Sequence, residues 1–437
     1  MSIAKGLVNW VDARLPVVDA FKKHMSEYYA PKNFNFWYYF GVFSLVVLVN
    51  QLLTGIWLTM FYSPTDAFAS VEYIMRDVQF GWLIRYMHAV GASAFFAVVY
   101  LHMFRGLLYG SYKPPRELVW IFGMMIYLAL MAEGFLGYVL PWGNMSYWGA
   151  QVIISLAEAI PFQVIPFVDA QQSAAIGEAL TTWVRGDYLL SDATVNKFFA
   201  LHVVAIPLVL VALVVLHILA LHEVGSNNPD GVEIKQNKDE NGIPKDGIPF
   251  HPYYTVKDLA GIVVFLMVFA VVVFFFPEGG GYFIERPNFE PANPLATPDH
   301  IAPVWYYGPY YAMLRATTFS FILDAKSWGL IVMGGAIAIL FVVPWLDRHP
   351  VKSIRYKGMF SKVTLMLFAF VFIVLGYFGT QPDQVAFTIP FTSADVTYTH
   401  LAGLGTIYYF FYFLFVLPFG HRFEKSKPVP DRVTGGH

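Results

Sequence analysis

Eight stretches of about 20 mostly apolar residues constrain the fold of this chain more than any other feature of its sequence. Only 13% of the 437 residues are charged, about half the share found in soluble domains. A helix of about 20 apolar residues just crosses the hydrocarbon core of a bilayer. We therefore predict an all-α integral membrane protein with eight transmembrane helices. The predicted spans are residues 36–61, 80–108, 118–140, 198–221, 257–276, 328–346, 361–379 and 402–419.

Three connections between these stretches are long. Residues 141–197 contain a Pro-Trp-Gly turn and are expected to form surface helices. Residues 222–256 are expected to be a solvated loop, and residues 277–327 are too polar to span. With eight spans, 21 of the 28 Lys and Arg residues fall on the side of the termini. Because Lys and Arg accumulate on the cytoplasmic side, both termini are predicted to be cytoplasmic.

The composition also excludes several kinds of site. The chain has no cysteine, which rules out disulfides, an iron–sulfur cluster on this chain and thioether-linked haem. Any metal must be bound by His, Met or carboxylate groups, or arrive inside a cofactor. The net charge of −2 gives no reason to expect a nucleic-acid partner.

Four of the 12 histidines lie well inside apolar stretches, namely His88, His102, His202 and His217. A lone histidine in such a place is more often hydrogen-bonded to a neighbouring helix. Here, each helix carries two on one broad side, separated by roughly 21 Å of helical rise. The second and fourth spans run in the same direction, so His88 should face His202 near the outer side and His102 should face His217 near the inner side. Two facing pairs at two depths suit two haems, whereas zinc would need ligands at one depth.

Four glycines repeat the spacing of the first histidine pair. Gly41 and Gly55 are separated by the same interval as His88 and His102, and so are Gly123 and Gly137. A flat macrocycle inside a four-helix bundle needs helices without side chains where it approaches. Ordinary close packing of helices at small residues is the alternative interpretation.

Arg85 and Arg105 each lie close in sequence to a histidine, at a distance of about one helical turn. Their guanidinium groups are suited to pair with haem propionates. For Arg105, an ordinary positive charge near the membrane surface is an equally good interpretation.

Taken together, these features resemble cytochrome b, the membrane core of the cytochrome bc complex (respiratory complex III), over nearly the whole chain. The resemblance also rests on the segments Gly137-Tyr-Val-Leu-Pro-Trp-Gly143 and Pro303-Val-Trp-Tyr306. The photosynthetic relative that oxidises plastoquinol divides this chain into two proteins and so fits less well. Long loops at 159–193 and 225–250 favour a bacterial form over a mitochondrial one.

The resemblance implies that residues 1–222 form a four-helix bundle around two non-covalent b haems, and that residues 223–437 carry the 303–306 loop. It implies a quinol–cytochrome-c reductase in the bacterial cytoplasmic membrane. Quinol would be oxidised at an outer site, and electrons would pass through both haems to quinone at an inner site, contributing to the proton gradient. Implied partners are a Rieske iron–sulfur protein, a c-type cytochrome subunit, quinone, membrane lipid and a second copy of the complex.

The resemblance further implies two sets of quinone-site residues. At the inner site, His222, Lys257 and Asp258 match the family's positions, and titratable groups there are able to protonate quinone oxygens. Polar residues at helix ends, level with the lipid headgroups, are the alternative. The outer pocket would be lined by Tyr138, Trp142, Gly143, Pro303, Tyr306 and Tyr311.

At Val304 the sequence departs from the family, which usually has Glu there to bind quinol and carry a proton. Valine does neither. Glu133, an intramembrane carboxylate one helical turn before Gly137, is our candidate for a substitute proton carrier. A neutral, structural Glu133 is equally compatible with the sequence.

Two other classes of protein stay open at this point. A transporter that uses intramembrane His and Glu as a proton relay would bind no haem. A haem-bearing membrane anchor would only pass electrons to a dehydrogenase, but such anchors are usually shorter and lack the Pro-x-Trp-Tyr segment.

Overall fold

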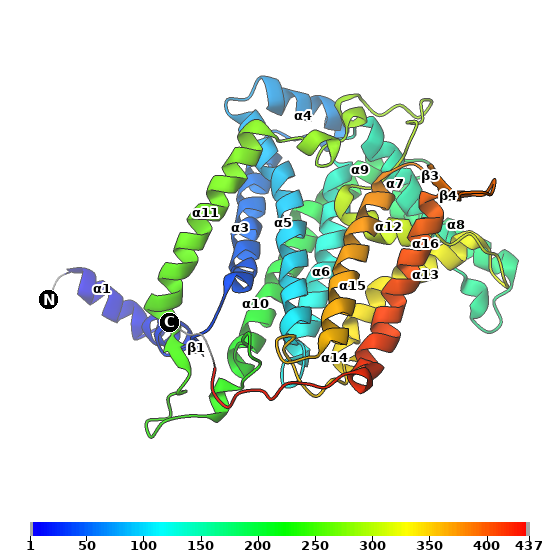
Figure 1. Cartoon of the computed structure of the whole chain (residues 1–437). Helices are drawn as coiled ribbons and strands as arrows, with labels where there is room; N and C mark the ends of the chain where they lie inside the picture. Colours follow the sequence, from blue (N-terminus) through cyan, green and yellow to red (C-terminus); the bar gives the residue numbers. More distant parts are fainter. Residues whose placement is uncertain (1–2, 434–437) are drawn as a thin grey trace.

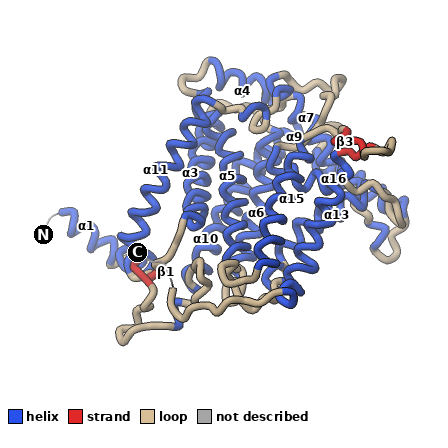
Figure 2. Tube along the Cα trace, viewed as in Figure 1, coloured by secondary structure: helices blue, strands red, loops and turns tan. Residues whose placement is uncertain are grey.

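The computed structural model describes residues 3–433 and is built almost entirely of helices (Figures 1 and 2). Long helices stand side by side, and short helices and loops cap the bundle at both ends. The long helices are α3 (Tyr39–Thr59), α5 (Gly81–Tyr109), α6 (Glu117–Val139), α10 (Ile206–Val224), α11 (Thr255–Phe275), α13 (Ala325–Phe341), α15 (Met359–Thr380) and α16 (Tyr398–Phe411).

The remaining elements are short and lie mainly at the two ends of the bundle. The helices are α1 (Ile3–Asp12), α2 (Val17–Phe21), α4 (Ala67–Arg76), α7 (Asn144–Ser155), α8 (Ala170–Arg185), α9 (Asp192–Ala200), α12 (Gly308–Arg315), α14 (Val343–Leu346) and α17 (Leu417–Phe419). Two antiparallel strand pairs complete the fold, β1 (Tyr29–Pro31) with β2 (Gly247–Pro249), and β3 (Val385–Thr388) with β4 (Asp395–Thr397). Both α7 and α8 lie in the connection 141–197, where surface helices were predicted: α8 is largely exposed, whereas seven of the 12 residues of α7 are buried.

Seven helical segments of the described chain are long and apolar enough to cross a membrane, and they match seven of the eight predicted spans. The predicted span 328–346 falls on α13, an apolar helix of 17 residues. Lys326 near its start donates a hydrogen bond to the Ser155 carbonyl, and the Leu340 carbonyl near its end accepts one from Trp120. Helix α13 therefore connects the two ends of the bundle, although the count of eight spans stays a prediction.

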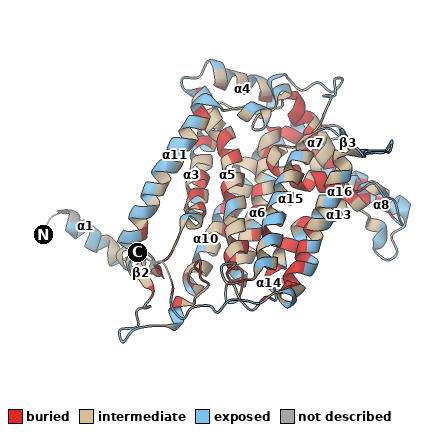
Figure 3. Cartoon of the chain, viewed as in Figure 1, coloured by how far each residue is buried: buried red, intermediate tan, exposed pale blue. Residues whose placement is uncertain are grey.

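Both chain termini lie at the lower left of Figure 1, at the same end of the bundle as α14. We call this the terminal end, and the end with α4 and α7 the outer end. Helix α3 packs along α5, and α6 along α10. Helix α11 stands at the edge with most of its apolar side chains exposed (Figure 3), as expected for a helix that faces lipid.

The prediction of a solvated loop at 222–256 is wrong for its first part. Asn228 and Asp230 are at most 1% exposed. The Asp230 carboxylate accepts hydrogen bonds from Asn33, Arg355 and Tyr356. A buried carboxylate needs such partners to offset the cost of leaving water.

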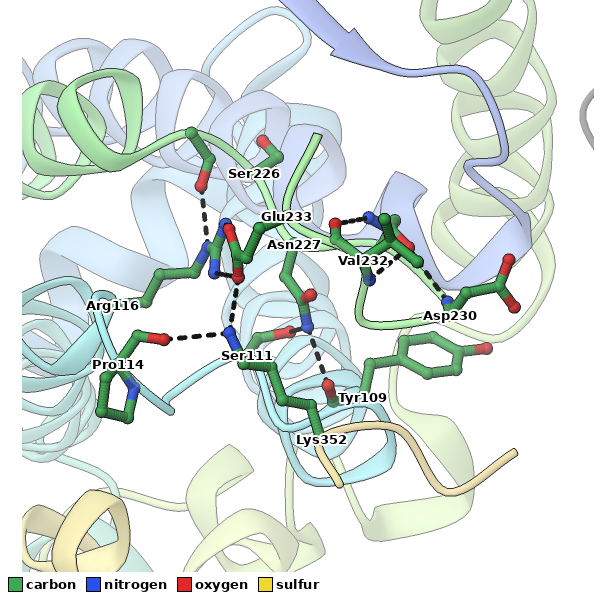
Figure 4. A network of polar contacts seen from close by, with 12 residues as sticks. Tyr109, Ser111, Pro114, Arg116, Ser226, Asn227, Asp230, Val232, Glu233 and Lys352 are labelled. Atoms are coloured by element: carbon green, nitrogen blue, oxygen red, sulfur yellow. Dashed lines mark hydrogen bonds and ion pairs between the residues drawn. The ribbon is translucent and has the colours of Figure 1, made fainter. Parts of the chain in front are cut away.

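Arg116 extends this buried network at the terminal end (Figure 4). Its guanidinium forms a two-pronged ion pair with Glu233, with N–O distances of 2.6 and 2.8 Å. Lys352 contacts the same carboxylate. Ion pairs thereby connect three segments: the one after α5, the one after α10 and the one before α15.

Candidate functional site

The four intramembrane histidines form the two predicted pairs. The ring centres are 6.2 Å apart for His88 and His202, and 6.3 Å apart for His102 and His217. A metal–imidazole bond of about 2.0 Å, plus about 1.1 Å from nitrogen to ring centre, puts two ligands on opposite sides of one metal about 6.2 Å apart. Each pair therefore has the separation that one six-coordinate iron requires. We call them the outer pair and the inner pair.

The Nδ1 atom of each histidine lies beside a group of the protein. At His88, His202 and His217 this group can accept a hydrogen bond from Nδ1–H, which leaves Nε2 as the nitrogen free to bind a metal. At His102 the group is the guanidinium of Arg105, which donates and accepts no such bond. The contacts of Nδ1 are Thr54 Oγ1 for His88 (2.9 Å), the Glu133 carbonyl (3.1 Å) and Oε1 (3.0 Å) for His202, Arg105 Nη2 for His102 (3.3 Å) and the Val119 carbonyl for His217 (2.9 Å).

Each of the four spaced glycines faces one of these imidazole rings. A methyl group at Gly137 would clash with the ring, and at Gly41 and Gly55 it would be tightly packed against it. The approach of a macrocycle to these glycines stays a prediction. The distance from an added Cβ atom to the nearest ring atom would be 3.3 Å at Gly41 (ring of His102), 3.2 Å at Gly55 (His88), 3.4 Å at Gly123 (His217) and 2.5 Å at Gly137 (His202).

A π-helical turn, Leu201–Ala205, lies within the fourth span between α9 and α10 and contains His202. Pro207 follows it and has no N–H to donate to the carbonyl one turn earlier, which favours a shifted hydrogen-bond ladder. Such a turn holds one residue more than an α-helical turn. The interval from His202 to His217 is also one residue longer than the interval from His88 to His102. The π-helical turn absorbs this extra residue, which explains how both pairs align.

The surroundings of the inner pair fit the propionate of a haem. Among the described residues, Arg105 Nε is buried without a hydrogen-bond partner. Its guanidinium lies 5.0 Å from the Tyr38 ring centre, and its Nη1 lies 3.4 Å from Ser111 Oγ. A buried guanidinium with a free N–H is suited to a carboxylate. At the outer pair, Arg85 lines the cavity described next.

One cavity of about 530 Å³ continues from the outer pair to the predicted quinol pocket. The part beside the outer pair and the part beside the quinol pocket share this single space. Its walls include Gly55, Arg85, His88, Glu133, Gly137, Tyr138, His202, Glu285, Val304 and Tyr306.

Glu285 is a carboxylate of this cavity that sequence reasoning missed. Tyr138 donates a hydrogen bond of 3.0 Å to Glu285 Oε2, and Asn288 donates to both groups. Burial raises the pKa of Glu285 to about 7, although these hydrogen bonds oppose the rise. Glu285 lies in the polar connection after α11 and belongs to no motif, so no signal in the sequence singled it out.

The other residues predicted for the outer pocket divide into those that line the cavity, such as Tyr306, and those that do not. Tyr306 is buried and stacks on Phe96, with ring centres 3.8 Å apart. Trp142, Gly143, Pro303 and Tyr311 are not among the residues that line the cavity. Trp142 instead contacts Tyr147, and Tyr311 donates a hydrogen bond to the Ile301 carbonyl.

The predicted inner-site residues all lie at the terminal end, on two helices. His222 stacks on Tyr28 with ring centres 4.4 Å apart. Lys257 donates to the Phe34 carbonyl, and half-buried Asp258 follows it in the first turn of α11. The segment 28–34 therefore contacts both helices, a role that the sequence did not predict.

Comparisons with known proteins agree with this geometry. The family model Cytochrome b/b6/petB matches residues 25–225, and Cytochrome b(C-terminal)/b6/petD matches residues 291–410. Cytochrome b of Allochromatium vinosum is 54% identical over 433 residues, 98% of each chain. Cytochrome b of Rhodospirillum rubrum is 46% identical over 98% of this chain and 96% of that one.

A solved structure of a hyperthermophilic respiratory complex III contains a similar chain. It superposes with a TM-score of 0.81 at 37% identity, covering 95% of this chain and 99% of that one. The family binds haem b, which fits the histidine pairs, and the apolar helices make this chain a multi-pass membrane protein. The chain therefore belongs to the cytochrome b family.

Proposed function

We propose that this chain is the catalytic membrane subunit of a quinol–cytochrome-c reductase. Quinol is oxidised in the outer cavity, and electrons reach quinone at the terminal end by way of two b haems. The observation that carries the proposal is the single cavity that joins the outer pair to Tyr138, Glu285 and Tyr306. Residues 1–222 provide the haem-binding bundle, and residues 223–437 provide the 303–306 loop.

The residues that would hold the two haems are His88 with His202, and His102 with His217. When bound, the haem irons supply one-electron acceptors at two depths. Arg85 and Arg105 bind propionates in this proposal. The acceptors beside Nδ1 of His88, His202 and His217 would hold these rings with Nε2 available to an iron.

Glu285 is the group best placed to accept a proton from quinol. Its carboxylate lines the cavity and is held by Tyr138 and Asn288. The side chain of Val304 cannot accept a proton. In this chain the carboxylate in the cavity is instead that of Glu285, which comes from an earlier part of the same connection. Glu133 stays a second candidate, but its Oε1 is already occupied by His202.

Partners and location follow from the same family. We propose that a Rieske iron–sulfur protein takes one electron from each quinol, that a c-type cytochrome subunit receives it, and that the complex is a homodimer. The bacterial relatives support a place in the bacterial cytoplasmic membrane. The excess of Lys and Arg at the terminal end supports cytoplasmic termini.

Purified complex, containing the chain with its partner subunits, should show two b-haem components in a reduced-minus-oxidised spectrum. It should also catalyse quinol-dependent reduction of cytochrome c. A preparation without absorbance in the Soret region would favour a proton-relay transporter. Haem without quinol–cytochrome-c reductase activity would instead favour a membrane anchor.

At the inner site, Asp258→Leu and His222→Leu should each slow reoxidation of the inner haem by quinone, while quinol-driven reduction stays largely intact. Both changes remove a titratable group near quinone oxygens that must be protonated. Flash or stopped-flow absorbance of the inner haem measures the rate. The exposed neighbour Glu223, changed to Gln, is the control, and wild-type reoxidation in both test variants would remove these residues from the site.

A further inference from the structure

His202 differs from the other three paired histidines in the charge beside its Nδ1 atom. His88 and His217 lie against a neutral hydroxyl and a neutral carbonyl, and His102 lies against the guanidinium of Arg105. His202 alone among the four lies against a carboxylate, with Glu133 Oε1 at 3.0 Å. Among the groups beside Nδ1, the outer pair therefore has a carboxylate and the inner pair a guanidinium.

The carboxylate of Glu133 is not needed to orient the His202 ring. The backbone carbonyl of the same residue already lies 3.1 Å from Nδ1 and can accept its N–H. The second carboxylate oxygen, Oε2, is buried and has no hydrogen-bond partner among residues 3–433. The backbone of Glu133 can therefore orient the His202 ring by itself. What the side chain adds is a buried carboxylate beside the ring.

We propose that Glu133 acts through His202 to lower the reduction potential of the outer haem relative to the inner one. A carboxylate 3.0 Å from Nδ1 would raise the electron density on the imidazole and so would favour the ferric state of a bound iron. At the inner pair, the guanidinium beside His102 acts in the opposite direction. The proposal rests on the two-haem part of the proposed function, and Glu133 acts in it by its charge, through His202.

This charge pattern gives the electron path a direction. Glu133 would destabilise an electron at the outer pair, and Arg105 would stabilise one at the inner pair. With haems bound, this difference would favour the inner one as the electron acceptor. Because Arg105 also pairs with a propionate in the proposed function, the cleaner test is Glu133.

The test is a redox titration of the purified complex at one pH, with chemical mediators and without quinol turnover. The absorbance of each haem is followed separately. In Glu133→Gln, the outer haem should shift to higher potential and the inner haem should not move. Glu133→Asp, which keeps the carboxylate at a longer distance, should shift in the same direction by less. Thr54→Val removes a neutral contact from His88 of the same pair and should shift the outer haem less than Glu133→Gln.

An outer haem with the wild-type potential in Glu133→Gln would overturn the proposal, as would an equal shift of both haems. If the Gln variant loses the haem, Glu133→Asp decides by itself: a higher potential supports the proposal, and an unchanged one overturns it. Absence of two haems in the unaltered complex would be a failure of the proposed function, and not of this inference.

Discussion

His202→Leu is expected to remove one of the two haem components completely, and His88→Leu should remove the same component. Their rings are 6.2 Å apart across one proposed iron, and leucine offers no ligand. His102→Leu and His217→Leu should together define the second component. Because electrons must pass both sites, each of the four variants should also lose quinol–cytochrome-c reductase activity.

Pyridine haemochrome content and low-temperature reduced-minus-oxidised spectra measure this result. The exposed histidine His400, changed to Leu, is the matched control and should retain both haems. If His88→Leu and His217→Leu removed the same component, the assignment of ligands by depth would be wrong. Retention of both haems in any of the four variants would remove that histidine from the ligand set.

Glu285→Gln is expected to slow quinol-driven reduction of the outer haem by about 100-fold, the low end of what a general base contributes. The pKa of Glu285 is raised to about 7 by burial, so the fraction able to accept a proton increases as pH rises through that value. The wild-type rate should therefore rise with pH around 7 and level off above it. Glutamine does not titrate, so the variant should lose this pH dependence.

Pre-steady-state haem reduction in membranes, with the inner site inhibited, measures both effects. Glu290→Gln, an exposed residue of the same connection, is the control. Adding Val304→Glu to Glu285→Gln should restore part of the rate, since Val304 lines the same cavity. If Glu285→Gln kept the wild-type rate while Glu133→Gln was slow and independent of pH, the proton acceptor would be Glu133 and not Glu285.

The sequence alone was sufficient for features that depend on spacing within one helix. The seven confirmed spans follow from runs of apolar residues, and the histidine pairs follow from the spacing of two histidines on each of two parallel helices. In a regular α-helix, the extra residue between His202 and His217 would turn one ring by about 100°. The π-helical turn that corrects this rotation depends on the local hydrogen bonds before Pro207.

Contacts between distant segments were not predictable. Glu285 meets Tyr138 across 147 positions of the chain, so its burial and raised pKa have no local sequence signal. Asp230 is typical of a solvated loop by its neighbours, yet it is buried because Asn33 and Arg355 converge on it. In both cases a polar residue is buried by partners that only the fold brings together.

The π-helical turn at Leu201–Ala205 also bears on how chain length can vary in this helix. A turn of this kind contains one inserted residue, and the helix on either side of it keeps its ordinary α-helical geometry. Deleting one residue between His202 and Pro207 would restore an ordinary α-helix with the same histidine spacing as the second span. Both histidines would keep their direction. Loss of a single residue is therefore tolerable here, whereas in a regular stretch of helix between two ligands it would rotate one histidine away from its partner.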